Sequence, residues 1–334
     1  MITVTRIPLN TFAIAFGLAG LAEAWSAASD SIGISVVVAQ AFWLLVAAVW
    51  MGLIVAHLVR GARSEASLAE QLRHPVQGPL AALVPVSGML VAGDVASFST
   101  AAGITMFLLA LATSAVFAGW MVAFWVRGGL QLDSVHGGWL LPTVAAGLVG
   151  ADVAAEVGLP LLGWALFGVG AFFWSIMTLL VMARLAFGNP LPDPLVPTTA
   201  ILLAPPGVAG VAWFALDGLR PSAGAAAIAG LGALLILTQV ALVPRYRRLR
   251  FSLGFWSFTF PAAAVIVEAM LWLHILAVPG WQVLTGALLI ALNALIGAIG
   301  VRTLADVMTH RRERIAEAVL VRADEAVVRE DLRV

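Results

Sequence analysis

Residues 252–277 read SLGFWSFTFPAAAVIVEAMLWLHILA, an apolar stretch that contains one acidic residue, Glu268, and one internal proline, Pro261. About 20 apolar residues in an α-helix are enough to cross the roughly 30 Å hydrocarbon core of a bilayer. This stretch therefore predicts a transmembrane helix. Because proline removes a backbone hydrogen bond, we expect a bend or break near Pro261.

Nine further stretches of about 17 to 26 residues have the same apolar character. The ten predicted spans, numbered in chain order, lie at approximately 10–27, 34–59, 79–97, 101–126, 137–157, 160–183, 197–216, 225–243, 252–277 and 281–301. The composition agrees, because 62% of the 334 residues are hydrophobic and only 11% are charged, too little charge for the surface of a soluble protein. We predict an all-α integral membrane protein whose transmembrane domain covers residues 1–301.

The arginines predict the orientation, because short loops rich in basic residues stay in the cytoplasm. The loops after spans two, four, six and eight contain Arg60, Arg63, Arg73, Arg127, Arg184, Arg245, Arg247, Arg248 and Arg250. The alternate loops hold a single arginine, Arg220, and carry acids such as Asp30 and Asp217. We therefore expect a multi-pass protein of the inner (plasma) membrane with both termini in the cytoplasm.

Internal prolines fall only on odd-numbered spans. They lie roughly five to nine residues into spans three, five, seven and nine, at Pro85, Pro142, Pro205 and Pro261. Glycine pairs three residues apart also fall on odd spans, and begin at Gly17, Gly147 and Gly207. Broken helices at membrane depth need protein or a water-filled cavity around the freed backbone groups. We predict five helical hairpins around a central pore, with the kinked odd helices as the inner ring. The alternative is that proline is simply more frequent in membrane helices.

Residues 302–334 differ from the rest of the chain because they are rich in charge. Apolar residues recur there at near-helical spacing, at Leu304, Met308, Ile315 and Val319. This pattern is typical of an amphipathic cytoplasmic helix or a partly disordered tail, and docking on a membrane surface or a partner is one role it could have, less favoured than simple solvation.

The predicted inner ring should attract anions at its cytoplasmic mouth. All five odd helices would point their N-termini there, and five helix dipoles sum to about +2.5 elementary charges before screening. Within the spans, the predicted lining has no basic residues. An anion would therefore meet apolar walls and kinked backbone, which implies weak binding, fast passage and sorting by charge sign and width.

Residues 254–261, GFWSFTFP, closely resemble the ninth-helix motif of the family that joins bacterial tellurite-resistance proteins, fungal malic acid transporters and the slow anion channels of plant guard cells. Supporting matches occur in order at His74-Pro75, WLLP (139–142), ILLAP (201–205) and GLAGL (17–21). The resemblance covers nearly the whole chain up to about residue 301, and the order and spacing of the motifs make it specific.

The resemblance implies five hairpins around a pore in each subunit, assembly as a homotrimer, and a phenylalanine of the ninth helix that plugs the conduit. Matching the motif places that gate at Phe260, immediately before Pro261. Phe258 is the rival position, on a helix face about 200° away. Ordinary helix packing is the alternative for both. An aromatic ring fills and dewets a narrow pore, and a rotamer change reopens it.

Two acids, Glu23 and Glu268, lie inside spans near the predicted outer end. Intramembrane carboxylates are expensive and are therefore candidates for function. Either acid could be a proton-coupling group of a symporter, or a residue that snorkels to the outer interface or stays protonated between helices. Both explanations stay open for Glu268, and the second is favoured for Glu23.

Several classes of function are disfavoured. The chain has no cysteine, its five histidines show no metal-ligand spacing, and it contains no nucleotide-binding motif. We expect no catalytic chemistry, no cofactor and no metal, and as partners only small anions and lipid, with no nucleic acid. The predicted function is a gated channel for small monovalent anions. The alternative is a proton-coupled transporter of dicarboxylates or of oxyanions such as tellurite or sulfite.

Overall fold

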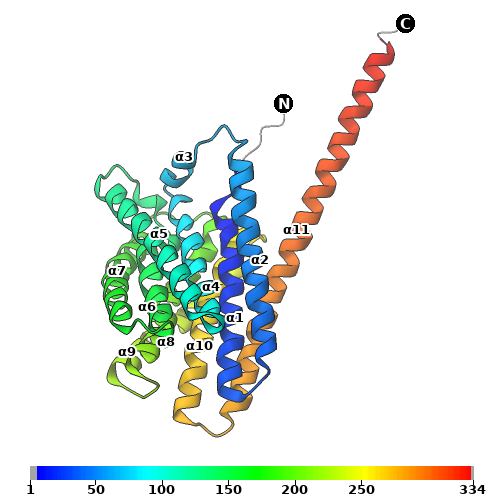
Figure 1. Cartoon of the computed structure of the whole chain (residues 1–334). Coiled ribbons are helices and arrows are strands. Elements are labelled where there is room, and N and C mark those ends of the chain that lie inside the picture. Colours follow the sequence, from blue (N-terminus) through cyan, green and yellow to red (C-terminus); the bar gives the residue numbers. More distant parts are fainter. Residues whose placement is uncertain (1–5, 332–334) are drawn as a thin grey trace.

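The computed structural model describes residues 6–331, and the side chains of residues 6–309 (Figure 1). Within the described residues every regular element is a helix. Ten of these helical segments are long and apolar enough to cross a membrane: Leu9–Ile32, Val36–Gly61, Gly78–Phe98, Thr100–Val126, Gly137–Glu156, Pro160–Phe187, Asp193–Asp217, Ala223–Tyr246, Leu253–Leu276 and Trp281–Thr309. The predicted all-α class and the number of spans are confirmed.

Each odd span begins with a helical segment that is not α-helical and continues as an α-helix. The opening segments are 3₁₀ helices, with a π-helical turn at η5: η1 (Leu9–Phe12), η2 (Gly78–Ala82), η4 (Gly137–Leu140), η5 (Leu141–Ala145), η6 (Asp193–Leu203) and η7 (Leu253–Phe258). The α-helices that follow are α1 (Ala13–Ile32), α4 (Leu83–Phe98), α6 (Ala146–Glu156), α8 (Ala204–Asp217) and α10 (Thr259–Leu276).

The even spans are uninterrupted α-helices. They are α2 (Val36–Gly61), α5 (Thr100–Val126), α7 (Pro160–Phe187), α9 (Ala223–Tyr246) and the first part of α11 (Trp281–Asp331). Short helices α3 (Leu68–Arg73) and η3 (Leu132–Ser134) lie in the connecting loops.

The prolines of the odd spans explain where the helix type changes. Pro85, Pro205 and Pro261 all lie in the first turn of an α-helix, and Pro142 lies in the π-helical turn. A proline lacks the backbone N–H that an interior helical position uses, but it is tolerated in the first turn. A 3₁₀ segment therefore precedes each of these prolines, and at Pro142 the proline itself lies in a further π-helical turn. The expected bend or break takes this form.

The odd helices form a closed inner ring. In the order around the ring, α1 contacts α10, α10 contacts α8, α8 contacts α6, α6 contacts α4, and α4 contacts α1. In the most apolar window of each odd span, 50 to 89% of residues are buried, against 6 to 28% in the even spans. The even helices are therefore an outer layer, and their exposed apolar side chains, such as Leu44, Val116 and Leu161, form a lipid-compatible surface.

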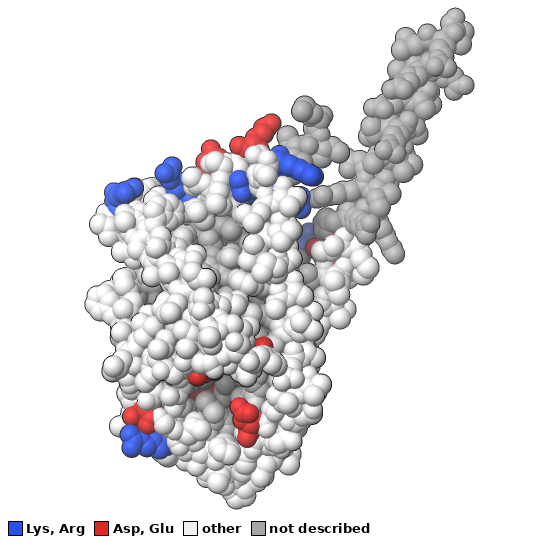
Figure 2. Space-filling view, in the orientation of Figure 1, with Lys and Arg blue, Asp and Glu red and all other residues white. Residues whose placement is uncertain are grey.

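The two ends of the bundle differ in charge. Figure 2 shows arginine side chains gathered at one end, and Figure 1 shows α11 leaving the bundle at that end. We call it the arginine end; all five odd spans begin there. The opposite end, where Asp30, Asp94 and Glu156 lie near the ends of odd spans, is the acidic end. The apolar positions Ile315 and Val319 predicted for the tail lie outside the residues whose side chains are described.

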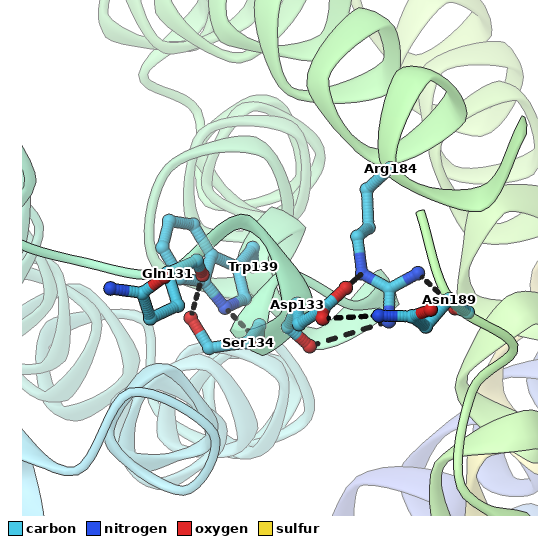
Figure 3. Close-up of polar contacts among 6 residues, drawn as sticks. All are labelled: Gln131, Asp133, Ser134, Trp139, Arg184 and Asn189. Carbon is cyan, nitrogen blue, oxygen red and sulfur yellow. Dashed lines mark hydrogen bonds and ion pairs between the residues drawn. The ribbon is translucent and has the colours of Figure 1, made fainter. Parts of the chain in front are cut away.

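Arg184 ties two loops together at the arginine end (Figure 3). Its side chain is only 2% exposed, and its Nε lies 3.4 Å from Oδ1 of Asp133. One guanidinium nitrogen donates to the backbone oxygen of Asn189 (2.6 Å), and the Asn189 amide donates to the Asp133 carboxylate (2.8 Å). The end of α7 is thereby fixed to the loop that precedes span five. Arg184, which the sequence analysis used only to predict the orientation in the membrane, therefore also has a structural role.

His136, in the same loop as Asp133, fastens this end to the loop before span three. The backbone N–H of Gly138 donates to Nδ1 of His136 (3.1 Å), so Nε2 carries the proton and donates to the Val76 oxygen (3.0 Å). Burial lowers the pKa of His136 to about 4, although the Val76 carbonyl acts in the opposite direction. The neutral imidazole thus joins the loops that lead into spans three and five.

Candidate functional site

The centre of the inner ring contains a cavity of about 160 Å³ that begins at the arginine end. We call it the arginine-side cavity. All five odd spans contribute to its wall, and none of its lining residues carries an ionisable side chain. The polar amide and hydroxyl groups of the wall belong to Asn10, Gln77, Thr198, Ser252 and Ser257. An anion in this cavity would meet neutral dipoles and apolar carbon, as the sequence predicted for the lining.

Phe260 lies between this cavity and a second one. The second, of about 30 Å³, is lined on its way toward the acidic end by Gly20, Glu23, Leu90, Val149, Asp152, Val208, Val211, Phe260, Ala263, Ala264 and Val267. We call it the acid-side cavity. Phe260 is 6% exposed, and its ring stacks on that of Phe16 with a centroid distance of 3.6 Å. A pair of stacked aromatic rings therefore occupies the boundary between the two cavities.

Two glycines of α1 allow α10 to approach closely and so position Phe260. A Cβ atom added at Gly20 would lie 2.7 Å from Cβ of Ala263 and 3.2 Å from the Phe260 ring. At Gly17 an added Cβ would collide with the side chain of Thr259. The Thr259 hydroxyl in turn donates to the Trp256 oxygen (2.7 Å), which holds the start of α10 against η7. Because Gly17 and Gly20 have no side chains, α10 can pack close to α1, and this close packing sets the position of the Phe260 ring.

Phe258, the rival position, points elsewhere. Its ring contacts those of Tyr246 (centroid distance 4.8 Å) and Phe255 (5.7 Å). It lines a groove between α9, α10 and α11 and is not among the residues that line the arginine-side or acid-side cavity. Two residues along a helix rotate the side chain by about 200°, which accounts for the separation.

The other positions singled out in the sequence divide into two groups. Pro205 and Pro261 line the arginine-side cavity, whereas Pro85 and Pro142 are buried outside both cavities. The three glycines lie at helix contacts: Gly17 faces α10, Gly147 faces Gly170 of α7, and Gly207 faces Ala264 of α10. Their small size serves close helix packing, and a lining role stays a prediction.

The acidic residues are distributed unequally. Glu23 lines the acid-side cavity, together with Asp152 of α6. Glu268 is 3% exposed, and its carboxyl group faces Gly210 of α8 and Gly232 of α9, away from the lining of both cavities. Proton coupling by Glu268 stays a prediction, and the structure assigns it no position on the conduit.

A wider space continues from Glu23 to the acidic end. This acidic vestibule, of about 530 Å³, is lined by Glu23, Asp94, Glu156 and neutral residues of α1, α2, α4, the start of α5 and the turn after α6. Glu23 therefore borders both the acid-side cavity and the vestibule. Within the described residues no group of three or more His, Asp or Glu side chains has the geometry to hold a metal ion.

Sequence reasoning missed Phe16 and Asp152 as lining residues. Phe16 lies in the first turn of α1, one residue before the glycine motif, and Asp152 follows the Gly147–Gly150 pair by two residues. Proximity to these small residues was a usable signal, because helices approach one another most closely there. Stacking across sequence-distant helices leaves no local pattern in the sequence.

Comparison with known proteins agrees with this geometry. The family model described as voltage-dependent anion channel, SLAC1, matches residues 6–304. A tellurite resistance protein TehA homolog from Haemophilus influenzae is 24% identical over 80% of the chain and 82% of its own length. The S-type anion channel SLAH2 of Arabidopsis thaliana is 21% identical over 78% of the chain, which spans about half (51%) of that protein. The guard cell S-type anion channel SLAC1 of the same plant is 27% identical over 47% of the chain and 28% of its own length. The chain belongs to the SLAC1 family of voltage-dependent anion channels.

Proposed function

We propose that this protein is a gated channel for small monovalent anions such as chloride or nitrate, and that Phe260 is its gate. One observation carries the proposal: a cavity without ionisable lining residues, formed by all five odd spans, ends at the Phe260 ring. A neutral, narrow wall binds an anion weakly, which favours passage over capture. Family membership supports the coarser statement that the protein transports anions.

The arginine end supplies the attraction for anions. The odd spans begin there, so the positive ends of their backbone dipoles face the entrance, next to the arginine loops. We place this end in the cytoplasm, because short arginine-rich loops stay inside, and we assign the protein to the plasma membrane. Attraction at the entrance raises the local anion concentration without a tight binding site in the path.

Phe260 closes the path by filling it. The Phe260 ring lines both cavities and stacks on Phe16, so an anion that moves from one cavity to the other would have to pass these rings and shed its water there. Rotation of the Phe260 side chain to another staggered conformation would open the passage. An anion that passes the ring interacts more favourably with its electropositive edge than with its electronegative face.

We also propose that three copies assemble, each with its own conduit, and that residues 302–334 form a cytoplasmic tail outside the transmembrane domain of residues 1–301. The exposed apolar side chains of the outer helices suit both lipid and a neighbouring subunit. Subunit contacts on this layer would leave the inner ring unchanged.

A proton-coupled carrier of dicarboxylates or oxyanions is the second candidate. The name of the Haemophilus relative, a tellurite resistance protein homolog, and the buried carboxyl group of Glu268 favour it. A carrier moves protons with its substrate in fixed proportion, whereas a channel passes anions down their own gradient.

Flux measurements in proteoliposomes distinguish these two functions. We expect the purified full chain to pass chloride and nitrate, with a current that reverses at the anion equilibrium potential. A reversal potential that shifts with the pH gradient at constant anion gradients would instead show stoichiometric proton coupling and contradict the channel.

Glu268→Gln sharpens this test. Because Glu268 lies outside the lining of both cavities, we expect the variant to keep its anion flux within about twofold of the wild type, a difference of about 0.4 kcal/mol in the barrier. Loss of proton-linked uptake of a dicarboxylate, tellurite or sulfite in this variant would support the carrier instead.

A further inference from the structure

Two carboxyl groups lie directly on the acidic side of Phe260. Glu23 of α1 and Asp152 of α6 line the same acid-side cavity as the gate ring. Asp152 is 93% buried, since its exposed fraction is 7%, and among the described residues no hydrogen bond or ion pair joins its carboxyl group to a partner. A buried carboxyl group without a partner is costly in a protein interior and calls for a functional reason.

Among the residues whose side chains are described, the surroundings of this pair supply negative charge and no unpaired cation. The groups that interact electrostatically with Glu23 are Glu156, Asp152 and Asp94, all of them carboxyls. Of the elements packed around the pair, α1 adds Asp30, α8 adds Asp217, and α10 adds Glu268 and His274, the last against Trp281. Arg220, the arginine at this end, is 70% exposed and paired with Asp217 at 3.1 Å.

The remaining neighbouring elements do not neutralise the pair. Helix α5 has no ionisable residue, and α2, α7, α9 and the described part of α11 carry theirs at the arginine end, at His57, Arg60, Arg184, Arg245, Tyr246, Arg302 and Asp306. An anion that passes Phe260 must therefore cross a narrow cavity beside two carboxyl groups with no compensating positive charge. At about 30 Å³ the cavity has room for little more than one water molecule, so an ion passes within contact distance.

The charge on these two groups decides whether that crossing is feasible. An ionised carboxylate within about 5 Å of an anion, at an effective dielectric constant near 20, slows its passage by about two orders of magnitude. A protonated carboxyl group has no net charge and can donate a hydrogen bond to the anion. Proton binding to the pair therefore removes the electrostatic repulsion of the anion and provides hydrogen-bond donors to it instead.

We propose that Glu23 and Asp152 form a proton-binding site on the anion path, and that anions cross only when both carboxyl groups carry a proton. The inference rests on the proposed channel function and adds its dependence on acidity. Protons reach the site from the acidic end through the vestibule, because Glu23 lines both spaces. Each carboxylate takes up one proton and releases it again, so the site switches with the pH on that side.

The test measures chloride flux in proteoliposomes with the gate removed. In the Phe260→Ala background, we expect flux to rise at least about tenfold when the pH at the acidic end falls from about 8 to about 5. Adding Glu23→Gln and Asp152→Asn should give flux that is high at both pH values. Asp30→Asn is the matched control, because Asp30 is an exposed carboxyl at the same end that lines neither the acid-side cavity nor the acidic vestibule. It should keep the pH dependence.

The results separate this inference from the channel proposal. If the triple variant keeps the pH dependence of the Phe260→Ala variant, the proton site is wrong and the channel stands. If the Phe260→Ala variant passes no anion at any pH, the channel proposal is wrong, and so is the proposal that Glu23 and Asp152 control anion passage.

A second measurement tests proton binding without flux. In the purified full chain at about pH 5, where the flux test expects both groups to carry a proton, we expect an infrared carbonyl band of protonated carboxyl groups that loses intensity in Glu23→Gln/Asp152→Asn. Single variants replace the double variant if it does not fold. An unchanged band in variants that elute and melt like the wild type would overturn the proton site.

Discussion

The two sides of Phe260 offer an anion different surroundings. On the arginine side a cavity of about 160 Å³ is lined without ionisable side chains, whereas on the other side a cavity of about 30 Å³ includes Glu23 and Asp152. In the proposed channel, this contrast implies that the end of the bundle and its backbone dipoles attract the anion, because the wall of the arginine-side cavity offers no charged ligand. We further propose that Glu23 and Asp152 form the charge barrier on the other side of Phe260.

Removing the ring that separates the two sides should have the largest effect. We expect Phe260→Ala to raise anion conductance about a hundredfold, which corresponds to about 2.7 kcal/mol in the barrier, because the two cavities would join. Single-channel or macroscopic current in planar bilayers, at acidic pH on the side of Glu23 and Asp152, measures the change.

Phe258→Ala is the matched control for this prediction. The same atoms are deleted two residues earlier, but in a groove between α9, α10 and α11. Conductance should stay at the wild-type value. Equal conductance increases in both variants would show that general loosening of α10, and not opening of the path, explains the effect.

A smaller change at the boundary should follow from Gly20→Ala. The added Cβ atom would lie 2.7 Å from Cβ of Ala263, so α1 and α10 must move apart and the Phe260 ring loses its fit. We expect a loss of stability of about 1–3 kcal/mol and a rise in anion flux below that of Phe260→Ala. Thermal unfolding in detergent and liposome flux measure the two effects.

Gly52→Ala is the corresponding control on the outer layer. Nothing lies within 4 Å of an added Cβ there, and alanine is the better helix former. Stability and flux should therefore be maintained. A Gly20→Ala variant as stable as Gly52→Ala would contradict the tight contact between α1 and α10.

The arginine end should respond to acid through stability and not through conduction. The folded protein keeps His136 neutral because burial lowers its pKa to about 4, whereas the unfolded chain protonates it near 6.5. Between these values the unfolded state binds more protons, so the free energy of unfolding decreases as the pH falls, by up to about 1.4 kcal/mol per pH unit. Thermal unfolding across this range measures the slope.

His136→Asn should be less stable at neutral pH but should lose this part of the slope. The variant cannot take up the proton that favours the unfolded state. If wild type and variant keep identical slopes between about pH 4 and 6.5, another group is responsible for the acid sensitivity.

Local properties of the chain were enough to predict the layers of this fold. Hydropathy and length predicted ten spans, and the prolines of alternate spans predicted which helices are interrupted, because both signals depend on residues within one helix. The buried odd spans and exposed even spans agree with that alternation. Loop arginines likewise separated the two ends, since charge in a loop is also a local property.

The form of the interruptions was not predicted. A bend at Pro261 was expected, but the chain from Leu253 to Phe258 is a 3₁₀ helix that becomes α-helical just before the proline. Proline is tolerated in the first turn of an α-helix, so Pro261 does not itself require a 3₁₀ helix before it. The helix type of the preceding residues depends on the elements that pack against them. Packing of η7 against η6 is a tertiary contact that no single segment contains.

Composition and proline chemistry act within short segments, so the all-α membrane class and the alternation of interrupted and continuous spans could be predicted from the chain alone, and the resemblance of one motif to a known family supplied the candidate gate residue. Which side chains line the same cavity depends on how the helices pack against one another, and no single segment contains that information. Phe16 stacks on Phe260, and Glu23 and Asp152 line one cavity, although each pair comes from helices far apart in the chain, while Glu268 of the same helix as Phe260 faces away. The rotation of each helix about its axis follows from close packing at residues such as Gly20, and that packing exists only once the ring has closed.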